Sequence, residues 1–244
     1  AYPTSLPETR AVVNFVITHP NIAAGQTYHN SGGMILRGPG IEQDSVRSAD
    51  RQVYDVIGSR GEEILPGYRY IVIWKDLYTT WGNQLDWFYG GRGILTFSNE
   101  LWTSFNYFRE ASEPERWDRD SYRFDRYLLF GEAFVPWTPI EHPQFGMIEV
   151  GGLKKQFTRA IPGFLLREEA HRNMAFTLYQ AGQMPLVQVD SIEIRSLPGG
   201  LSEVRATVAN RRLTPTHTAQ DIEFGISPPD RITIDGGRVI AGFQ

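Results

Sequence analysis

The sequence predicts an α/β fold followed by a small all-β sandwich. Up to about residue 135, stretches with helical periodicity alternate with short apolar runs, which is the order of elements in α/β proteins. After Pro136 the chain becomes rich in proline, and it then passes into short alternating runs separated by glycine, proline and asparagine. With 244 residues, the chain is long enough to bury one large core or two smaller ones.

The first elements follow in the order helix, strand, helix, strand. A capping box of Ser5 and Glu8 predicts the start of a short amphipathic helix. Residues 21–28 read as a strand and residues 46–61 as a second helix. The continuously apolar run at 69–75 predicts a strand that is buried on both faces.

Later elements continue this pattern and then change it. A strand is predicted at 92–98 and a helix at 119–134. Another helix is predicted within 162–185, with Pro185 as its stop. Its apolar residues at helical spacing are Leu166, Ala170, Met174 and Leu178. The strands predicted for the sandwich are 186–197, 201–210, 221–227, 231–237 and 238–243.

The predicted organisation therefore has three parts. Residues 1–135 form the α/β domain, and residues 136–184 form a linker with a connecting helix. Residues 185–244 form the β-sandwich module, which we expect to be truncated because its last run stops at Gln244 without a closing turn.

Composition excludes several classes of partner and site. The net charge of −4 comes from interspersed charges without a basic block, so we expect no binding of nucleic acid or of an anionic membrane surface. No apolar run approaches the length that spans a membrane. The absence of cysteine leaves histidine, aspartate and glutamate as metal ligands. The histidines are His19, His29, His142, His171 and His217.

The stretch at residues 76–102 carries the most informative pattern. It contains Tyr78, then Gly82 four residues later, the pair Asp86-Trp87 eight residues later, and the pair Glu100-Leu101 fourteen beyond the aspartate. In order and spacing this stretch resembles the carboxypeptidase A-like zinc metallocarboxypeptidases. Residues 8–33 similarly resemble the helix and strand that lead to the third zinc ligand of that family. The resemblance implies that residues 1–135 are the C-terminal half of the family's mixed-sheet domain, with flanking helices.

The resemblance also implies roles for individual residues. His29 takes the position of a zinc ligand, and Glu100 takes that of the general base that removes a proton from the attacking water. Tyr78 takes the position of the tyrosine that covers and hydrogen-bonds the bound substrate. Leu85 lies where the family sets side-chain preference, and an apolar residue there favours apolar C-terminal residues. The implied cofactor is Zn²⁺ and the implied substrate is a peptide.

Part of the expected site is missing from the sequence. The other two zinc ligands of the family come from an upstream H-x-x-E motif, and no histidine here has a glutamate three residues later. The residues that bind the terminal carboxylate of the substrate would also precede Ala1. We therefore expect this chain alone to be inactive. Its partners would be the missing N-terminal half of its domain, or a second copy through the exposed sheet edge.

Three alternatives remain open from the sequence. The peptidase half can be degenerate, with the sandwich acting as a non-catalytic binding or adhesion module. Glu100 can work with Asp86 in a different, carboxylate-based hydrolase. His29 can be a structural residue, and residues 30–40 an ordinary glycine-rich turn. The family is often exported, which favours a secreted or periplasmic location over a cytoplasmic one.

Overall fold

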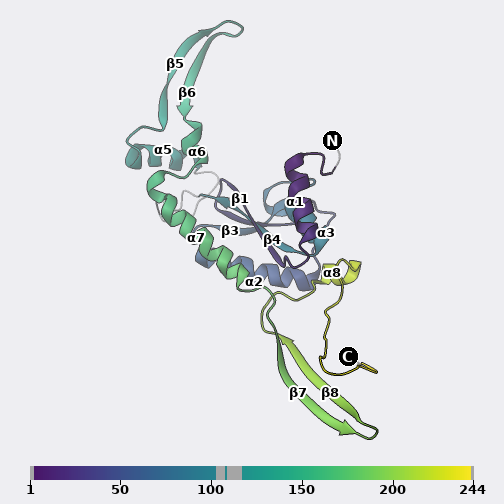
Figure 1. Ribbon diagram of the computed structural model, residues 1–244. Coiled ribbons are helices and arrows are strands. Elements are labelled where there is room, and N and C mark those ends of the chain that lie inside the picture. The colour runs from purple at the N-terminus through teal and green to yellow at the C-terminus, as the bar shows by residue number, and fades with distance from the viewer. Residues whose placement is uncertain (1–2, 103–107, 109–116, 243–244) are drawn as a thin grey trace.

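The computed structural model describes residues 3–102, 108 and 117–242, and it has the α/β character that the sequence predicts. Helices and strands alternate along the first part of the chain. They build a central sheet with helices on both of its faces, and β-hairpins project from this body in two directions (Figure 1). None of the described helices is long and apolar enough to cross a membrane.

The central sheet has four strands in the order β1-β4-β2-β3. β1 (Ala24–Asn30) runs parallel to β4 (Leu95–Leu101), and β2 (Met34–Arg37) lies antiparallel to β4 on its other side. β3 (Arg69–Val72) pairs with β2 in parallel. All four residues of β2 are buried, so the middle of the stretch 30–40 is a core strand and not only a glycine-rich turn.

One face of the sheet is covered by α2 (Ser48–Ile64) and α7 (Gly163–Ala181). Phe97 of β4 makes edge-to-face ring contacts with Tyr54 of α2 and Phe176 of α7, at centroid distances of 5.1 and 5.7 Å. All three side chains are less than 2% exposed. Aromatic contacts of this kind make this side the main core of the molecule.

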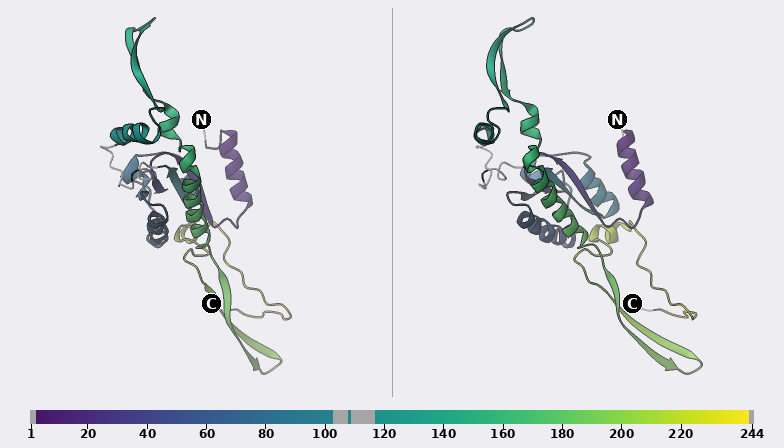
Figure 2. Two further views of the ribbon diagram at one scale, coloured as in Figure 1. Left: turned by 90° about the vertical axis from the view of Figure 1, so that its left-hand side faces the viewer. Right: turned by 60° about the vertical axis from the view of Figure 1, so that its left-hand side comes forward.

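The opposite face is covered by α1 (Pro7–Thr18) and α3 (Gln84–Arg92), as the side views show (Figure 2). Val16 of α1 and Phe88 of α3 pack with Ile94, which immediately precedes β4. The sheet is thus enclosed between two helical layers, as expected for strands that are apolar on both faces.

The start of α1 differs from the sequence prediction. Its N-cap residue is Leu6, which makes no side-chain capping hydrogen bond, and Pro7 lies in the first turn. Proline is well suited to this position because the first N–H groups of a helix have no partner within the helix. The predicted capping box of Ser5 and Glu8 is therefore wrong.

The strand predicted at 69–75 is divided between two conformations. β3 ends at Val72, and a π-helix, η1 (Ile73–Leu77), follows it. The helix predicted at 119–134 is present as α5 (Trp117–Leu128). A short helix that the sequence does not predict, α6 (Lys155–Arg159), precedes α7.

α7 turns a polar face toward the sheet and an apolar face outward. Its buried residues are Glu169, Asn173, Phe176 and Gln180. The apolar residues whose spacing predicts this helix are exposed, and 53% of Leu166, 46% of Met174 and 61% of Leu178 is accessible. This is the reverse of the usual arrangement, in which the apolar stripe of a helix faces the core.

Hydrogen bonds explain the orientation of α7. The Gln180 side chain donates to the backbone carbonyls of Gly25 (3.0 Å) and Leu95 (3.4 Å). The Asn99 side-chain amide donates to the Asn173 side-chain carbonyl at 2.8 Å. Because buried polar groups need partners, these bonds fasten the polar face of α7 to β1 and β4.

Two hairpins extend away from the sheet. β5 (Phe134–His142) pairs with β6 (Gly146–Leu153) inside the predicted linker, where the sequence predicts no hairpin. β7 (Val187–Leu197) pairs with β8 (Leu201–Asn210), and both strands agree with the prediction. Most residues of both hairpins are exposed.

The predicted β-sandwich over residues 185–244 is not confirmed. The described part of this segment contains the β7–β8 hairpin and a helix, α8 (Ala219–Phe224). The strand predicted at 221–227 is wrong, because α8 occupies most of it. The described residues 231–242 contain no strand. The predicted domain boundaries at residues 135 and 184 stay predictions.

Capping interactions account for the helical conformation of α8. The Thr218 hydroxyl accepts a hydrogen bond from the Asp221 N–H at 3.2 Å, as an N-cap residue does. The Asp50 carboxylate of α2 accepts from the N–H groups of Ala219 (2.8 Å) and Gln220 (3.0 Å). These partners satisfy the first N–H groups of α8, which the alternating pattern of the sequence does not reveal.

The segment after α8 is held by His217. Its Nδ1 lies 2.7 Å from Asp221 Oδ2, and its Nε2 lies 3.3 Å from Asp230 Oδ1. The Ser227 hydroxyl also lies 3.2 Å from Nδ1. The hydrogen bond with Asp221 and the charge of Asp230 raise the pKa of His217.

We expect Phe176→Ala to lower the free energy of unfolding by about 3–5 kcal/mol, because it removes a fully buried ring from the core between α7 and the sheet. Leu178→Ala on the same helix is the matched control, and it should change stability by less than about 0.5 kcal/mol because the side chain is exposed. Urea unfolding measures both. A larger loss for Leu178→Ala would show that α7 faces the other way.

The stability that His217 contributes should decrease with rising pH. A raised pKa in the folded state means that the folded chain binds this proton more tightly than the unfolded chain, in which histidine titrates near about 6.5. The contribution is therefore complete below about pH 6.5 and is lost as the pH passes the folded-state pKa. Unfolding of the native chain and of His217→Gln should differ most at low pH. A difference that does not depend on pH would contradict this assignment.

Candidate functional site

His29 and Glu100 are direct neighbours across two parallel strands. In the register of β1 and β4, His29 pairs with Glu100, next to the last pair of the ladder, Asn30 with Leu101. Since partners in a parallel register point to the same face, both side chains lie on one face at the carboxyl ends of the strands. His29 is exposed and Glu100 is half-buried. The fold thus brings together the two residues with the most specific predicted roles.

The surroundings of Glu100 are apolar on one side. Met34 of β2 pairs with Glu100 in the antiparallel register and is 8% exposed. Leu36, on the same face, packs with Met34 and Leu85. Glu100 therefore lies between an exposed imidazole and a buried apolar cluster.

Burial and charge act on the Glu100 carboxyl in opposite directions. Partial burial raises the pKa of Glu100, while the positive charges of His29 and Arg159 lower it. Burial is the largest of these effects, so the net pKa is above its ordinary value. The raised pKa makes the Glu100 carboxylate a stronger base than an exposed glutamate. A general base needs this property.

Arg159 is a site residue that sequence reasoning did not identify. It ends α6, and its backbone carbonyl accepts a hydrogen bond from the side-chain amide of Asn30, the residue after His29. Its side chain is exposed and acts electrostatically on Glu100. No local pattern around residue 159 marks it, because its proximity to Glu100 arises only when α6 returns to the strand ends.

Two hydroxyl groups lie two residues before the His29–Glu100 pair along β1 and β4. Thr27 and Ser98 are partners in the same register, so their side chains lie on the same face as His29 and Glu100. Their hydroxyl oxygens are buried, and neither has a hydrogen-bond partner among the described residues. These hydroxyl groups make the sheet surface next to His29 and Glu100 more polar.

Leu85 and Tyr78 differ in their surroundings. Leu85 is 6% exposed and packs in the cluster of Met34 and Ile71, on the face of the sheet that carries Glu100. Tyr78 directly follows η1, and 61% of it is accessible. An exposed tyrosine on a loop is free to move toward a ligand, but no described contact links Tyr78 to His29.

Asp86 fastens the loop that follows Tyr78. Its carboxylate accepts hydrogen bonds from the Gly40 N–H at 3.0 and 3.1 Å and from the Asn83 side chain. Burial raises the pKa of Asp86, and these hydrogen bonds oppose the rise. In addition, the Thr80 N–H donates to the Gly40 carbonyl at 2.8 Å. Asp86 therefore holds this loop against the segment around Gly40.

Within the described residues no group of three or more histidine, aspartate or glutamate side chains is arranged to hold a metal ion. His29 has the right chemistry for one ligand of zinc, since imidazole nitrogen binds it strongly and the side chain is exposed. A catalytic zinc site generally needs three protein ligands.

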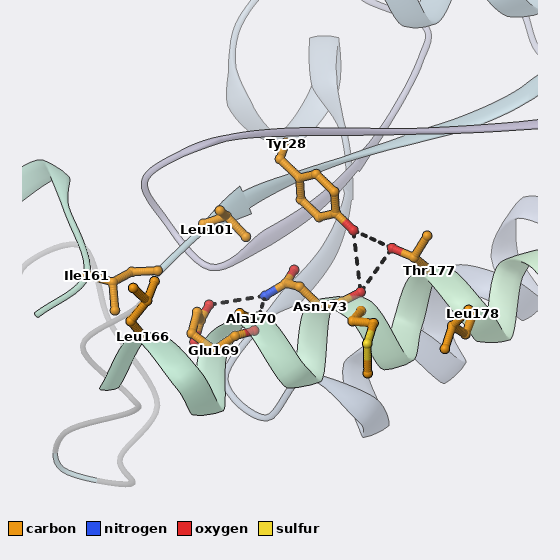
Figure 3. Close-up of a pocket in the computed structure, with 10 residues that line it drawn as sticks. Tyr28, Leu101, Ile161, Leu166, Glu169, Ala170, Asn173, Thr177 and Leu178 are labelled. Carbon is orange, nitrogen blue, oxygen red and sulfur yellow. Dashed lines mark hydrogen bonds between the residues drawn. The ribbon is translucent and has the colours of Figure 1, made fainter. Parts of the chain in front are cut away.

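A groove lies on the other face of the sheet. It has a volume of about 360 Å³, and Figure 3 shows Tyr28 and the side chains of α7 around it. Tyr28 and Leu101 alternate with His29 and Glu100 along their strands, so they point away from the candidate site. The exposed stripe of α7 forms the outer wall of this groove.

Comparison with known proteins bears only on the C-terminal part of the chain. Residues 186–244 match a family described as Domain of unknown function (DUF8731). No curated protein matches the chain. The matched segment begins with β7 and lies outside the residues that carry the metallocarboxypeptidase resemblance.

We expect Glu100→Gln to stabilise the metal-free chain at neutral pH. Because the folded-state pKa of Glu100 is raised, its contribution to stability is complete below the unfolded-state value, near about 4.3, and is lost as the pH rises through the folded-state value. Glutamine stays neutral and avoids this loss. Thermal unfolding with a chelator present should show a higher midpoint for Glu100→Gln at pH 7, with the advantage vanishing below about pH 4.

The control for this measurement is Glu141→Gln on the exposed β5 strand, which should leave the midpoint unchanged. A lower midpoint for Glu100→Gln at pH 7 would contradict the burial of an ionised carboxylate at this position.

Proposed function

We propose that this chain is part of a zinc-dependent carboxypeptidase that hydrolyses C-terminal residues from peptides. The observation that carries the proposal is the register pairing of His29 with Glu100. The resemblance assigns these residues to one catalytic centre although they are far apart in the sequence. Their approach on one face and at one end of the sheet is what such a centre requires.

Glu100 would act as the general base. A half-buried carboxylate with a raised pKa can take a proton from an attacking water and pass it to the leaving amine. Partial burial, beside Met34 in the register of β2, limits the hydration of the carboxylate, so its basicity is greater than that of an exposed glutamate.

His29 would supply one zinc ligand, and by the resemblance the remaining ligands would come from an upstream H-x-x-E motif. When bound, zinc would lower the pKa of a coordinated water and polarise the scissile carbonyl. The exposure of His29 leaves its imidazole accessible for this purpose.

Tyr78 and Leu85 would contact the substrate. Tyr78, 61% exposed, would cover the bound peptide and donate a hydrogen bond from its hydroxyl. Leu85, in the apolar cluster beside Met34, would favour an apolar side chain at the C-terminus of the substrate.

The segment that completes the site would be the N-terminal half of the same domain, preceding Ala1 in the native polypeptide. β1 lies at an edge of the described sheet, so a further strand can pair with it there. Without that segment we expect no hydrolysis and a tendency to self-associate through this edge. A secreted or periplasmic location fits the family that the chain resembles.

A non-catalytic binding function is the second candidate, and the β7–β8 hairpin favours it. Val189, Ile192 and Ile194 lie on one face of the hairpin and are 57–69% exposed, while Arg195 pairs with Glu203 across the other face at 2.9 Å. Such a hairpin offers an exposed apolar face that a binding partner could cover.

The native, unprocessed gene product should contain zinc and hydrolyse a peptide with a free C-terminus but not its amidated form. Glu100→Gln should lower kcat by about 100- to 10,000-fold with zinc retained, because it removes the general base. His29→Ala should lose zinc together with activity.

His142→Ala on β5 is the control and should leave both zinc content and kcat unchanged. Equal cleavage of the free and amidated peptides would contradict the carboxypeptidase assignment. A native product without zinc and without hydrolysis would favour the binding function.

A further inference from the structure

The chain just beyond Glu100 is held by a buried polar cluster. The Trp102 N–H donates to the Tyr68 hydroxyl at 2.9 Å and to Glu169 Oε1 at 3.1 Å. Trp102 has φ +78°, a left-handed conformation that a bulky residue rarely adopts. Because such a conformation persists only when its surroundings determine it, these two acceptors are important for how β4 ends.

The same residue joins the end of β4 to the loop that follows His29. The Gly32 N–H donates to the Trp102 carbonyl at 3.0 Å, and the Gly33 N–H donates to the Glu100 carbonyl at 2.9 Å. The N–H of Trp102 is thus held by the side chains of Tyr68 and Glu169. Its C=O in turn holds the loop after His29 through Gly32. A displacement of Trp102 would move both members of the His29–Glu100 pair.

Glu169 is placed for this task by the inward polar face of α7. It is 2% exposed, and it accepts hydrogen bonds from the Tyr68 hydroxyl and, at 3.3 Å, from the Asn173 side chain. Figure 3 shows Glu169 and Asn173 pointing toward one another from successive turns of α7. Burial raises the pKa of Tyr68, so its hydroxyl keeps its proton and remains a donor to Glu169.

Glu169 is one of the three polar residues that α7 buries, together with Asn173 and Gln180. An apolar side chain in its place would avoid the desolvation of a carboxyl group, and α7 has apolar residues that it leaves in solvent. A departure from the usual burial pattern of this kind is typical of positions that serve a functional site.

We propose that Glu169 is a positioning residue for Glu100: by holding the Trp102 N–H it fixes the end of β4 and the loop after His29, and so sets the distance between the general base and the zinc ligand. Glu169 lies on α7, outside the residues that resemble the peptidase family. The inference rests on the proposed function for its catalytic consequence, but the contact that it describes can be tested separately.

The catalytic test compares Glu169→Leu and Glu169→Gln in the native gene product. Glu169→Leu removes the acceptor and should lower kcat about 100-fold with KM within about twofold, because misplacement of a reacting group affects the chemical step. Glu169→Gln keeps an Oε1 acceptor and should retain kcat within about threefold. Glu168→Gln, on the exposed side of the same helix, is the control and should retain full activity.

The structural test uses amide hydrogen exchange in the same proteins, followed by NMR. In Glu169→Leu the protection factors of the Trp102, Gly32 and Gly33 amides should fall by about tenfold or more. The protection factor of the Ile71 amide in β3 should stay unchanged. Equal kcat in Glu169→Leu and the native protein, or a loss in Glu169→Gln as large as in Glu169→Leu, would overturn the proposal. Loss of protection at Ile71 as well would also overturn it, since Glu169 would then support the whole sheet.

If the native product shows no hydrolysis, the proposed function fails and the exchange experiment alone decides whether Glu169 fixes the strand ends. Unchanged protection at Trp102 in Glu169→Leu would refute the positioning contact in that case too.

Discussion

The candidate site depends on the parallel register of β1 and β4. A shift of one residue would send His29 and Glu100 to opposite faces of the sheet, because side chains alternate along a strand. Close packing holds the register. Gly25 lies opposite Thr96, and a Cβ atom on Gly25 would come within 2.6 Å of the Thr96 hydroxyl. On the other face, Phe97 is enclosed by aromatic rings from the two covering helices.

α7 connects this register to the rest of the molecule. Its buried polar side chains bind three parts of these strands. The Gln180 amide binds the beginnings of β1 and β4, and the Asn173 amide accepts from Asn99 of β4. The Glu169 carboxylate accepts from the N–H of Trp102, just beyond the end of β4. One helix therefore contacts β4 near its beginning, along its length and just beyond its end. Its apolar stripe is left outside and lines the groove behind the site, where another protein segment can cover it.

The sequence predicts most elements of the α/β part, because their periodicity is local and strong. It misses β2, whose four residues are too few for a pattern, and it makes no prediction for α3. It assigns α8 to a strand, because the contact of Asp50 with the start of α8 is tertiary. For the site, spacing together with the family resemblance was enough to select His29 and Glu100. Arg159 and Glu169 carry no such signal, because each reaches the site only through the fold.

The sequence by itself determined the α/β order, the absence of thiol chemistry, the lone histidine of the predicted metal site and the spacing that groups Tyr78 with Glu100. The tertiary structure decided which face of α7 is buried, that His29 and Glu100 are adjacent, and how the end of β4 is fastened. Local patterns encode periodicity and capping, whereas strand register and buried hydrogen bonds join residues that are distant in the sequence. Such contacts form only when the whole core is packed.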